Sequence, residues 1–226
     1  MVHKFIREEI NLMQVKIEKS IGQKFPDIKV YSLVVRLSDN YNLLPLEIPL
    51  VKEEISDIPV ICQWREIYRS MGIKPTKFLS SIESLIKRFK KNNWMTGINL
   101  VDFYNSLSIK HLAPIGIYDL SRINDLEVRF MQLNDAYNPL NSDKSFENSP
   151  KIMVYAHFHN IVCWAINHRD SADYCLNSNT KEILVVSEGF TTEQSNNAIK
   201  ALEEFREICI KNNLKTSTLY HSVIYG

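Results

Sequence analysis

The chain contains 226 residues, of which 45% are hydrophobic and 23% are charged, as is typical of a globular protein with a sizeable core. It carries 27 basic and 26 acidic residues, and this near balance excludes an overall field that would draw it onto nucleic acid or membranes. Only six residues are glycine. Dinucleotide fingerprints, P-loops, kinase glycine loops and nucleophile elbows each need two closely spaced glycines, so all four are excluded.

The four cysteines form no C-x-x-C pair and show no regular spacing. The N-terminus becomes acidic before any apolar run develops, and no stretch approaches the roughly 20 apolar residues of a membrane span. We therefore expect a cytoplasmic protein with reduced thiols and no membrane partner.

Apolar residues recur every three or four positions between Ile6 and Ile21, which predicts an amphipathic helix with Gly22 as its C-terminal cap. Residues 28–37 are predicted to form a buried strand. Three prolines and a polar turn follow, so the segment up to about residue 60 is expected to be irregular.

The next helix is predicted over residues 80–88 and begins with a capping box, in which the Ser80 hydroxyl and the Glu83 carboxylate each bind the other's backbone amide. Its C-terminal end is basic, which indicates either a solvated cap that suits the helix dipole or a patch that faces phosphates. The basic residues are Lys87, Arg88, Lys90 and Lys91.

A second helical pattern starts at Asn99. Asp102, Asn105 and Ser108 share one broad face of it. Such short polar side chains are poor helix formers but good hydrogen-bonding groups, so we expect them to tie this helix to neighbouring loops.

From residue 125 the pattern changes to β. Residues 126–130 form a predicted strand, residues 134–150 a loop, and residues 151–158 and 161–166 a hairpin. A short apolar strand over residues 183–186 precedes a closing helix over residues 192–211. With no linker or repeat, residues 1–226 are expected to form one layered, mixed α/β domain.

Two groups of residues are candidates for chemistry. His157 and His159 lie two positions apart, so they either share a metal ion or serve as structural histidines. Polar residues 167–171 directly follow the apolar strand that contains Trp164. Polar clusters at strand ends are typical of ligand sites, and the alternative is a surface turn with an Arg-Asp pair.

An ordered series of segments resembles the editing module of the bacterial phenylalanyl-tRNA synthetase beta subunit, formed by its third and fourth domains. The segments are residues 99–105, 114–120 and 126–129, and residues 80–88, 152–166 and 180–190 continue the similarity. The resemblance covers about residues 60–190. The helix and strand before it and the helix after it resemble the flanks of freestanding versions of the module.

This resemblance implies a three-layer β/β/α sandwich of mixed α/β class. It also implies the hydrolysis of a misacylated tRNA ester, with the acceptor end of tRNA or aminoacyl-tRNA as partner. We expect no metal, cofactor or DNA. Such a site needs donors for the oxyanion, a positioned water and a pocket that distinguishes one side chain from another.

The matched positions depart from the family. The editing histidine falls on Gly116, and the glutamate that reads the tyrosine hydroxyl falls on Val186, with Glu188 two residues later on the same side of a continuing strand. The glycine pair of the pocket falls on residues 167–168 or 168–169. We therefore expect a smaller and more charged pocket than one made for tyrosine.

The predicted catalytic residues are His168, Arg169 and Glu188, with Arg169 as oxyanion or phosphate ligand and His168 or Glu188 positioning water. The predicted substrate-binding residues are Gly116, Asn167, Asp170 and Thr180. Two alternatives remain open: a non-catalytic module that binds RNA or an amino-acid-like ligand, and a metal hydrolase that uses the two histidines.

Overall fold

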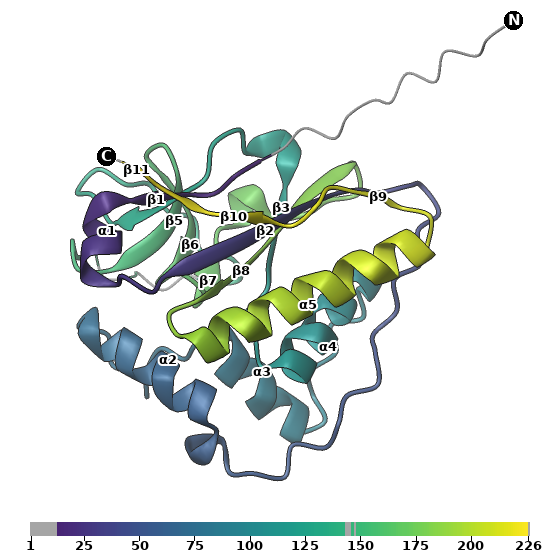
Figure 1. Ribbon diagram of the computed structural model, residues 1–226, viewed down its shortest axis with the longest axis horizontal. Helices are drawn as coiled ribbons and strands as arrows, with labels where there is room; N and C mark the ends of the chain where they lie inside the picture. The colour runs from purple at the N-terminus through teal and green to yellow at the C-terminus, as the bar shows by residue number, and fades with distance from the viewer. Residues whose placement is uncertain (1–12, 143–145, 147, 226) are drawn as a thin grey trace, which may run out of the picture.

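The computed structural model describes residues 13–142, 146 and 148–225, and these form three layers. Two β-sheets face each other, and helices α4 and α5 cover the outer face of the second sheet (Figure 1). The predicted β/β/α sandwich of mixed α/β class is therefore confirmed.

The first sheet has the strand order β11-β1-β4-β5-β6-β7. Its strands are β1 (Lys16–Glu18), β4 (Glu127–Phe130), β5 (Met153–His157), β6 (Asn160–Trp164), β7 (Arg169–Asp170) and β11 (Val223–Tyr225). The second sheet has the order β10-β2-β8-β3, and β9 also pairs with β2. Its strands are β2 (Lys29–Arg36), β3 (Gly116–Asp119), β8 (Glu182–Gly189), β9 (Lys215–Thr216) and β10 (Tyr220–His221).

The helices are α1 (Lys19–Lys24), α2 (Pro59–Ser70), α3 (Ser81–Lys90), α4 (Asn99–His111) and α5 (Thr192–Lys211). Short 3-10 turns lie at Ile55–Asp57, Leu120–Arg122 and Ala172–Tyr174. Helices α2 and α3 extend the core that lies between the two sheets. None of the described helices is long and apolar enough to cross a membrane.

Strand β2 shows why the sequence forms three layers. Its residues are buried on both faces: Val30 and Val34 join the core between the sheets, while Leu33 and Val35 join the core beneath α4 and α5. An eight-residue antiparallel pairing with β8 runs from Lys29 opposite Gly189 to Arg36 opposite Glu182. A strand covered on both faces is mostly apolar along its length, and residues 28–37 fit this, with only Lys29, Ser32 and Arg36 polar.

The N-terminal helix prediction was wrong over residues 13–18 and is confirmed over residues 19–21. Part of the predicted helix lies in residues 1–12, outside the described residues, but residues 16–18 form strand β1 and the helix begins only at Lys19. Ile17 is fully buried between β4 and β11, because parallel pairing on both sides decides the local structure here. Gly22 lies inside α1, and a Cβ there would stand 3.0 Å from the Ile224 side chain.

Three other expectations needed correction. Helix α2, with its buried Trp64, lies in a stretch for which no helix was predicted, and α5 does not close the chain, because three strands follow it. The Ser80 hydroxyl does accept from the Glu83 amide at 3.4 Å, as the capping box predicts. The buried Glu83 carboxylate, however, binds Arg65 and Lys87 rather than the Ser80 amide.

The polar residues of α4 act as predicted at two of the three positions. Asp102 accepts hydrogen bonds from the backbone amides of Thr96 and Gly97 and from the Thr96 hydroxyl. The Ser108 hydroxyl donates to the Ala113 carbonyl at 2.6 Å. Both ends of the helix are thereby tied to the adjoining loops, and the loop after it leads directly into Gly116.

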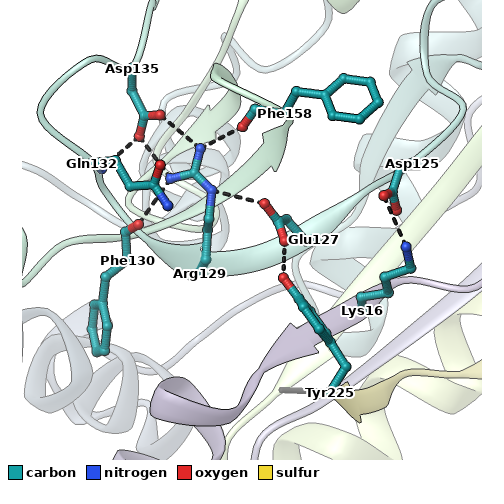
Figure 2. A network of polar contacts seen from close by, with 9 residues as sticks. All are labelled: Lys16, Asp125, Glu127, Arg129, Phe130, Gln132, Asp135, Phe158 and Tyr225. Carbon is teal, nitrogen blue, oxygen red and sulfur yellow. Dashed lines mark hydrogen bonds and ion pairs between the residues drawn. The ribbon is translucent and has the colours of Figure 1, made fainter.

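A buried arginine organises the hairpin of the first sheet (Figure 2). Arg129, which is 2% exposed, makes a bidentate pair with Asp135 at 2.7 and 2.8 Å and donates to Glu127 at 2.9 Å. It also donates to the carbonyls of Phe130 and Phe158. All three guanidinium nitrogens are therefore satisfied, and the turn at residues 132–135 is fixed to the tip of the β5–β6 hairpin.

Candidate functional site

A small pocket lies between the two sheets, with a volume of about 70 Å³. Strands β3 and β8 of the second sheet line one side, and β5, β6, β7 and the turn before β7 line the other, with the first residue of α3 at its margin. Six of the seven predicted site residues line this pocket: Gly116, Asn167, His168, Arg169, Asp170 and Glu188.

The turn between β6 and β7, together with β7 itself, presents four of these residues. Ala165 and Ile166 adopt left-handed backbone conformations, with φ of 51° and 60°. Positive φ is costly for a β-branched residue such as Ile166, and such strain persists only where the surroundings hold it. The turn is held by the hydrogen bond from the Ile166 amide to the Met153 carbonyl and by the bond from the His168 amide to the Trp164 carbonyl.

Glu188 is the most deeply buried carboxyl of the pocket, at 2% exposure. It accepts hydrogen bonds from the Tyr155 hydroxyl at 2.8 Å and from the Asn167 side-chain amide at 2.8 Å. Burial, with the negative charge of Asp170 nearby, raises the pKa of Glu188 to about 7, although the two hydrogen bonds oppose the shift. This carboxyl can therefore give up or take a proton near neutral pH.

Asp170 is the second carboxyl of the pocket. It accepts a hydrogen bond from the Tyr118 hydroxyl at 3.0 Å. Burial raises its pKa, against the opposing effects of hydrogen bonds from Cys163 and Tyr118 and of the charge on Arg169. Two carboxyl groups in one small cavity disfavour each other's ionised forms.

Asn167 joins the pocket to helices α2 and α3. Its side-chain oxygen accepts from the Tyr68 hydroxyl at 2.9 Å, while its amide group donates to Glu188. The first amide of α3, at Ser81, donates to the Asn167 carbonyl at 3.1 Å. Helix α2, helix α3 and strand β8 are thereby joined through one residue, whose side chain fixes the orientation of the Glu188 carboxylate.

His168 packs against the rings of Phe78, Phe146 and Trp164, and its Nδ1 lies 2.7 Å from the Leu79 carbonyl. Burial lowers its pKa. The neutral imidazole therefore donates through Nδ1, and this bond helps to hold the turn while leaving Nε2 unprotonated.

Arg169 donates through Nη1 to the Leu140 carbonyl at 2.7 Å. Its Nε is buried and has no hydrogen-bond partner among the described residues. Because Arg169 lines the pocket and carries a permanent charge, this N–H is suited to a ligand oxygen.

Gly116 is required because two neighbouring side chains approach its backbone closely, and not because the chain turns there. It begins strand β3, and a Cβ at this position would stand 2.8 Å from the Tyr118 hydroxyl oxygen and 3.2 Å from a Val186 methyl group. The Tyr118 hydroxyl therefore lies in contact distance of any side chain at the position to which the editing histidine matches.

Replacing Gly116 by alanine is expected to lower the free energy of unfolding by about 1–3 kcal/mol, because the methyl group would displace Tyr118 from Asp170. Urea unfolding measures the loss. In a Tyr118→Phe background the hydroxyl is gone, and the same substitution should cost clearly less. Equal costs in the two backgrounds would contradict this explanation.

The seventh predicted residue, Thr180, does not reach the pocket. It precedes β8 at the end opposite Glu188, and its hydroxyl donates to the buried Asp119 carboxylate at 2.8 Å. Among the pocket residues that the sequence reasoning missed, the side chains that contact the two carboxyls are Tyr118, Tyr155 and Cys163. Tyr118 follows Gly116 by two positions on one strand and thus shares its face, which is a usable signal. A buried tyrosine on β5 carries no such signal.

The two candidate metal-binding histidines do not come together. His157 has its ring nitrogens 2.8 Å from the Asn124 side-chain oxygen and 3.2 Å from the Tyr174 hydroxyl, whereas His159 is exposed at the hairpin turn. No group of three or more His, Cys, Asp or Glu side chains in the described part of the chain is arranged to hold a metal ion.

Comparison with known proteins places these features in a family. The family model of the B3/4 domain matches residues 63–209. A crystal structure of an N-terminal fragment of the phenylalanyl-tRNA synthetase beta-subunit from Pyrococcus horikoshii is similar, with 11% sequence identity and a TM-score of 0.47. The similarity covers 92% of this chain and 51% of that fragment, so the chain spans about half of its length. No curated protein matches the chain. Since the family model covers well over half of the sequence, the chain belongs to the B3/4 domain family and is a module like that of the phenylalanyl-tRNA synthetase beta subunit.

Proposed function

We propose that this domain binds the acceptor end of an aminoacylated tRNA and hydrolyses the ester that joins the amino acid to it, with the pocket between the sheets as the reaction site. The observation that carries the proposal is Glu188, a carboxyl with a pKa near 7 that is held in a fixed orientation beside a cavity. Family membership supports tRNA as the partner.

The residues of the pocket supply the steps that ester hydrolysis needs. Glu188 in its ionised form accepts a proton from a water molecule as the water oxygen bonds to the ester carbon. The Arg169 Nε–H donates to the oxyanion that develops on the carbonyl oxygen. When the carbon–oxygen bond to the ribose breaks, protonated Glu188 returns the proton to the ribose oxygen. The products are a free amino acid and a deacylated tRNA.

The direct experiment incubates the protein with tRNAs that carry different amino acids and measures the remaining ester. Salt should be kept near about 50 mM, because a domain with a net charge of +1 gains little from phosphate contacts, and low salt preserves the weak affinity that those contacts give. Deacylation above the buffer rate for at least one aminoacyl-tRNA is expected. If every aminoacyl-tRNA decays only at the buffer rate, hydrolysis is ruled out.

A second candidate is binding without catalysis. Both pocket carboxyls already accept hydrogen bonds from tyrosines of the chain itself, Tyr155 on Glu188 and Tyr118 on Asp170. A buried polar network of this kind also suits recognition of a ligand that leaves unchanged. Saturable binding of an aminoacyl-tRNA without product would favour this candidate.

A further inference from the structure

We propose that the pocket binds the α-ammonium group of an amino acid with a small side chain, and that Asp170 and Glu188 accept its hydrogen bonds. This inference rests on the proposed function, because the amino acid is taken to be the one esterified to RNA. It adds the class of amino acid and the two residues that recognise it.

The two carboxyls have unused acceptor positions to which an ammonium group can donate. An ionised carboxylate offers about four acceptor positions. Glu188 uses two of them, for Tyr155 and Asn167. Asp170 accepts from Tyr118 and interacts with the Cys163 thiol. Both side chains line the cavity, so each can accept a further hydrogen bond from a ligand there.

The charges in the pocket favour a cation. Arg169 is the one permanent cation among the lining residues, and its Nη1 is engaged by the Leu140 carbonyl. The other titratable groups that face the carboxyls are held neutral: burial lowers the pKa of His168 and raises the pKa values of Cys163, Tyr118 and Tyr155. Two carboxyls therefore share one arginine, and an ammonium ion would balance the charge of the second carboxyl when it ionises.

The volume of the cavity limits the size of the side chain that the bound amino acid can carry. About 70 Å³ accommodates a few atoms beyond an ammonium group. The hydroxyls of Tyr118 and Tyr155 fill the neighbouring space, and Tyr118 lies so close to Gly116 that even a methyl group there would collide with it. A ligand with an aromatic side chain would have to displace these tyrosines from their carboxyl partners.

Isothermal titration of the full chain at pH 7 tests this with stable amides. L-Alaninamide and L-lactamide have similar shapes, but alaninamide carries an ammonium group where lactamide carries a hydroxyl group. We expect alaninamide to bind at least about 10-fold more tightly than lactamide, since hydrogen bonds to charged groups are the stronger ones. L-Phenylalaninamide should bind at least about 10-fold more weakly than alaninamide.

Proton release gives an independent readout. The pKa of Glu188 is about 7, so at pH 7 this carboxyl is partly protonated. A bound cation favours the ionised form, and binding of alaninamide should therefore release a fraction of a proton from Glu188. Titrations in buffers with different ionisation enthalpies measure this release. Lactamide should release clearly less.

Variants locate the site. Asp170→Asn and Glu188→Gln should each weaken alaninamide binding about 10-fold, whereas Asp173→Asn should leave it unchanged, because Asp173 binds Asn138 outside the pocket. Equal binding of alaninamide and lactamide, equal binding of phenylalaninamide, or no binding of any amide would each overturn the proposal. The amides contain no ester, so alaninamide binding by a protein that deacylates no tRNA would overturn the proposed hydrolysis alone.

Discussion

Replacing Arg129 by methionine is expected to lower the free energy of unfolding by about 3–5 kcal/mol, because it leaves the Asp135 carboxylate buried without its cation. Both side chains are almost fully buried, at 2% and 0% exposure. The substitution also removes the donors for the Phe130 and Phe158 carbonyls, which hold the hairpin of the first sheet. A decrease in melting temperature of about 10 °C should accompany the loss.

Figure 2 also contains the matched control. Lys16 pairs with Asp125 at 2.9 Å on the same sheet, but both side chains are partly exposed, so Lys16→Met should cost less than about 1 kcal/mol. In the Arg129→Met/Asp135→Asn double variant the unpaired charge is gone, and the cost should be smaller than the sum of the single costs. Similar costs for Lys16→Met and Arg129→Met would refute the assignment of Arg129 as a buried anchor.

Glu188→Gln is expected to reduce the rate of tRNA deacylation by about 10²–10⁴-fold, the usual contribution of a positioned general base. The amide keeps the size of the side chain and can still accept from Tyr155, but it cannot take a proton from water. The wild-type rate should increase with pH and level off above about 7, as Glu188 ionises. The rate of the variant should lack this increase with pH.

Stability measurements separate this loss from unfolding. The pKa of Glu188 is raised from its usual 4.5 to about 7, so between these values the folded chain holds a proton that the unfolded chain releases. The wild type therefore loses stability as pH increases through this window. Glu188→Gln removes that dependence and should be no less stable than the wild type at pH 8.

A control carboxyl lies on the same strand. Glu182 pairs with Arg36 at 2.7 Å outside the pocket, so Glu182→Gln should retain full activity. If Glu182→Gln and Glu188→Gln lose activity equally, Glu188 has no specific role.

The sequence predicted the parts of the fold that depend on local patterns. Helix α5 covers residues 192–211 as predicted, because a capped amphipathic stripe of this length leaves little choice. Strand β1 was missed because Ile17 has both helical spacing in the sequence and two partner strands in space. Strands β9, β10 and β11 are two or three residues long, too short for a pattern, and they exist through pairing with distant strands.

The site could be predicted in part for the same reason. The polar run from Asn167 to Asp170 follows an apolar strand, and the order of family-like segments indicated Gly116 and Glu188. Nothing in the sequence indicated that Tyr155, on a different sheet from Glu188, would donate a hydrogen bond to it. Pairs that meet across two sheets depend on the completed sandwich, which no local pattern encodes.

The parallel pairing of β1 with β11 has a consequence for the order of folding. Lys16 lies opposite Val223, so this contact joins residues from nearly the two ends of the described chain. Closing so long a loop costs entropy that only the rest of the fold can offset. During synthesis, β1 can pair with β4 as soon as residue 130 has emerged, but its other edge stays open until residues 223–225 have emerged. The first sheet is therefore completed last, after the pocket residues on β5, β6, β7 and β8 are already in place.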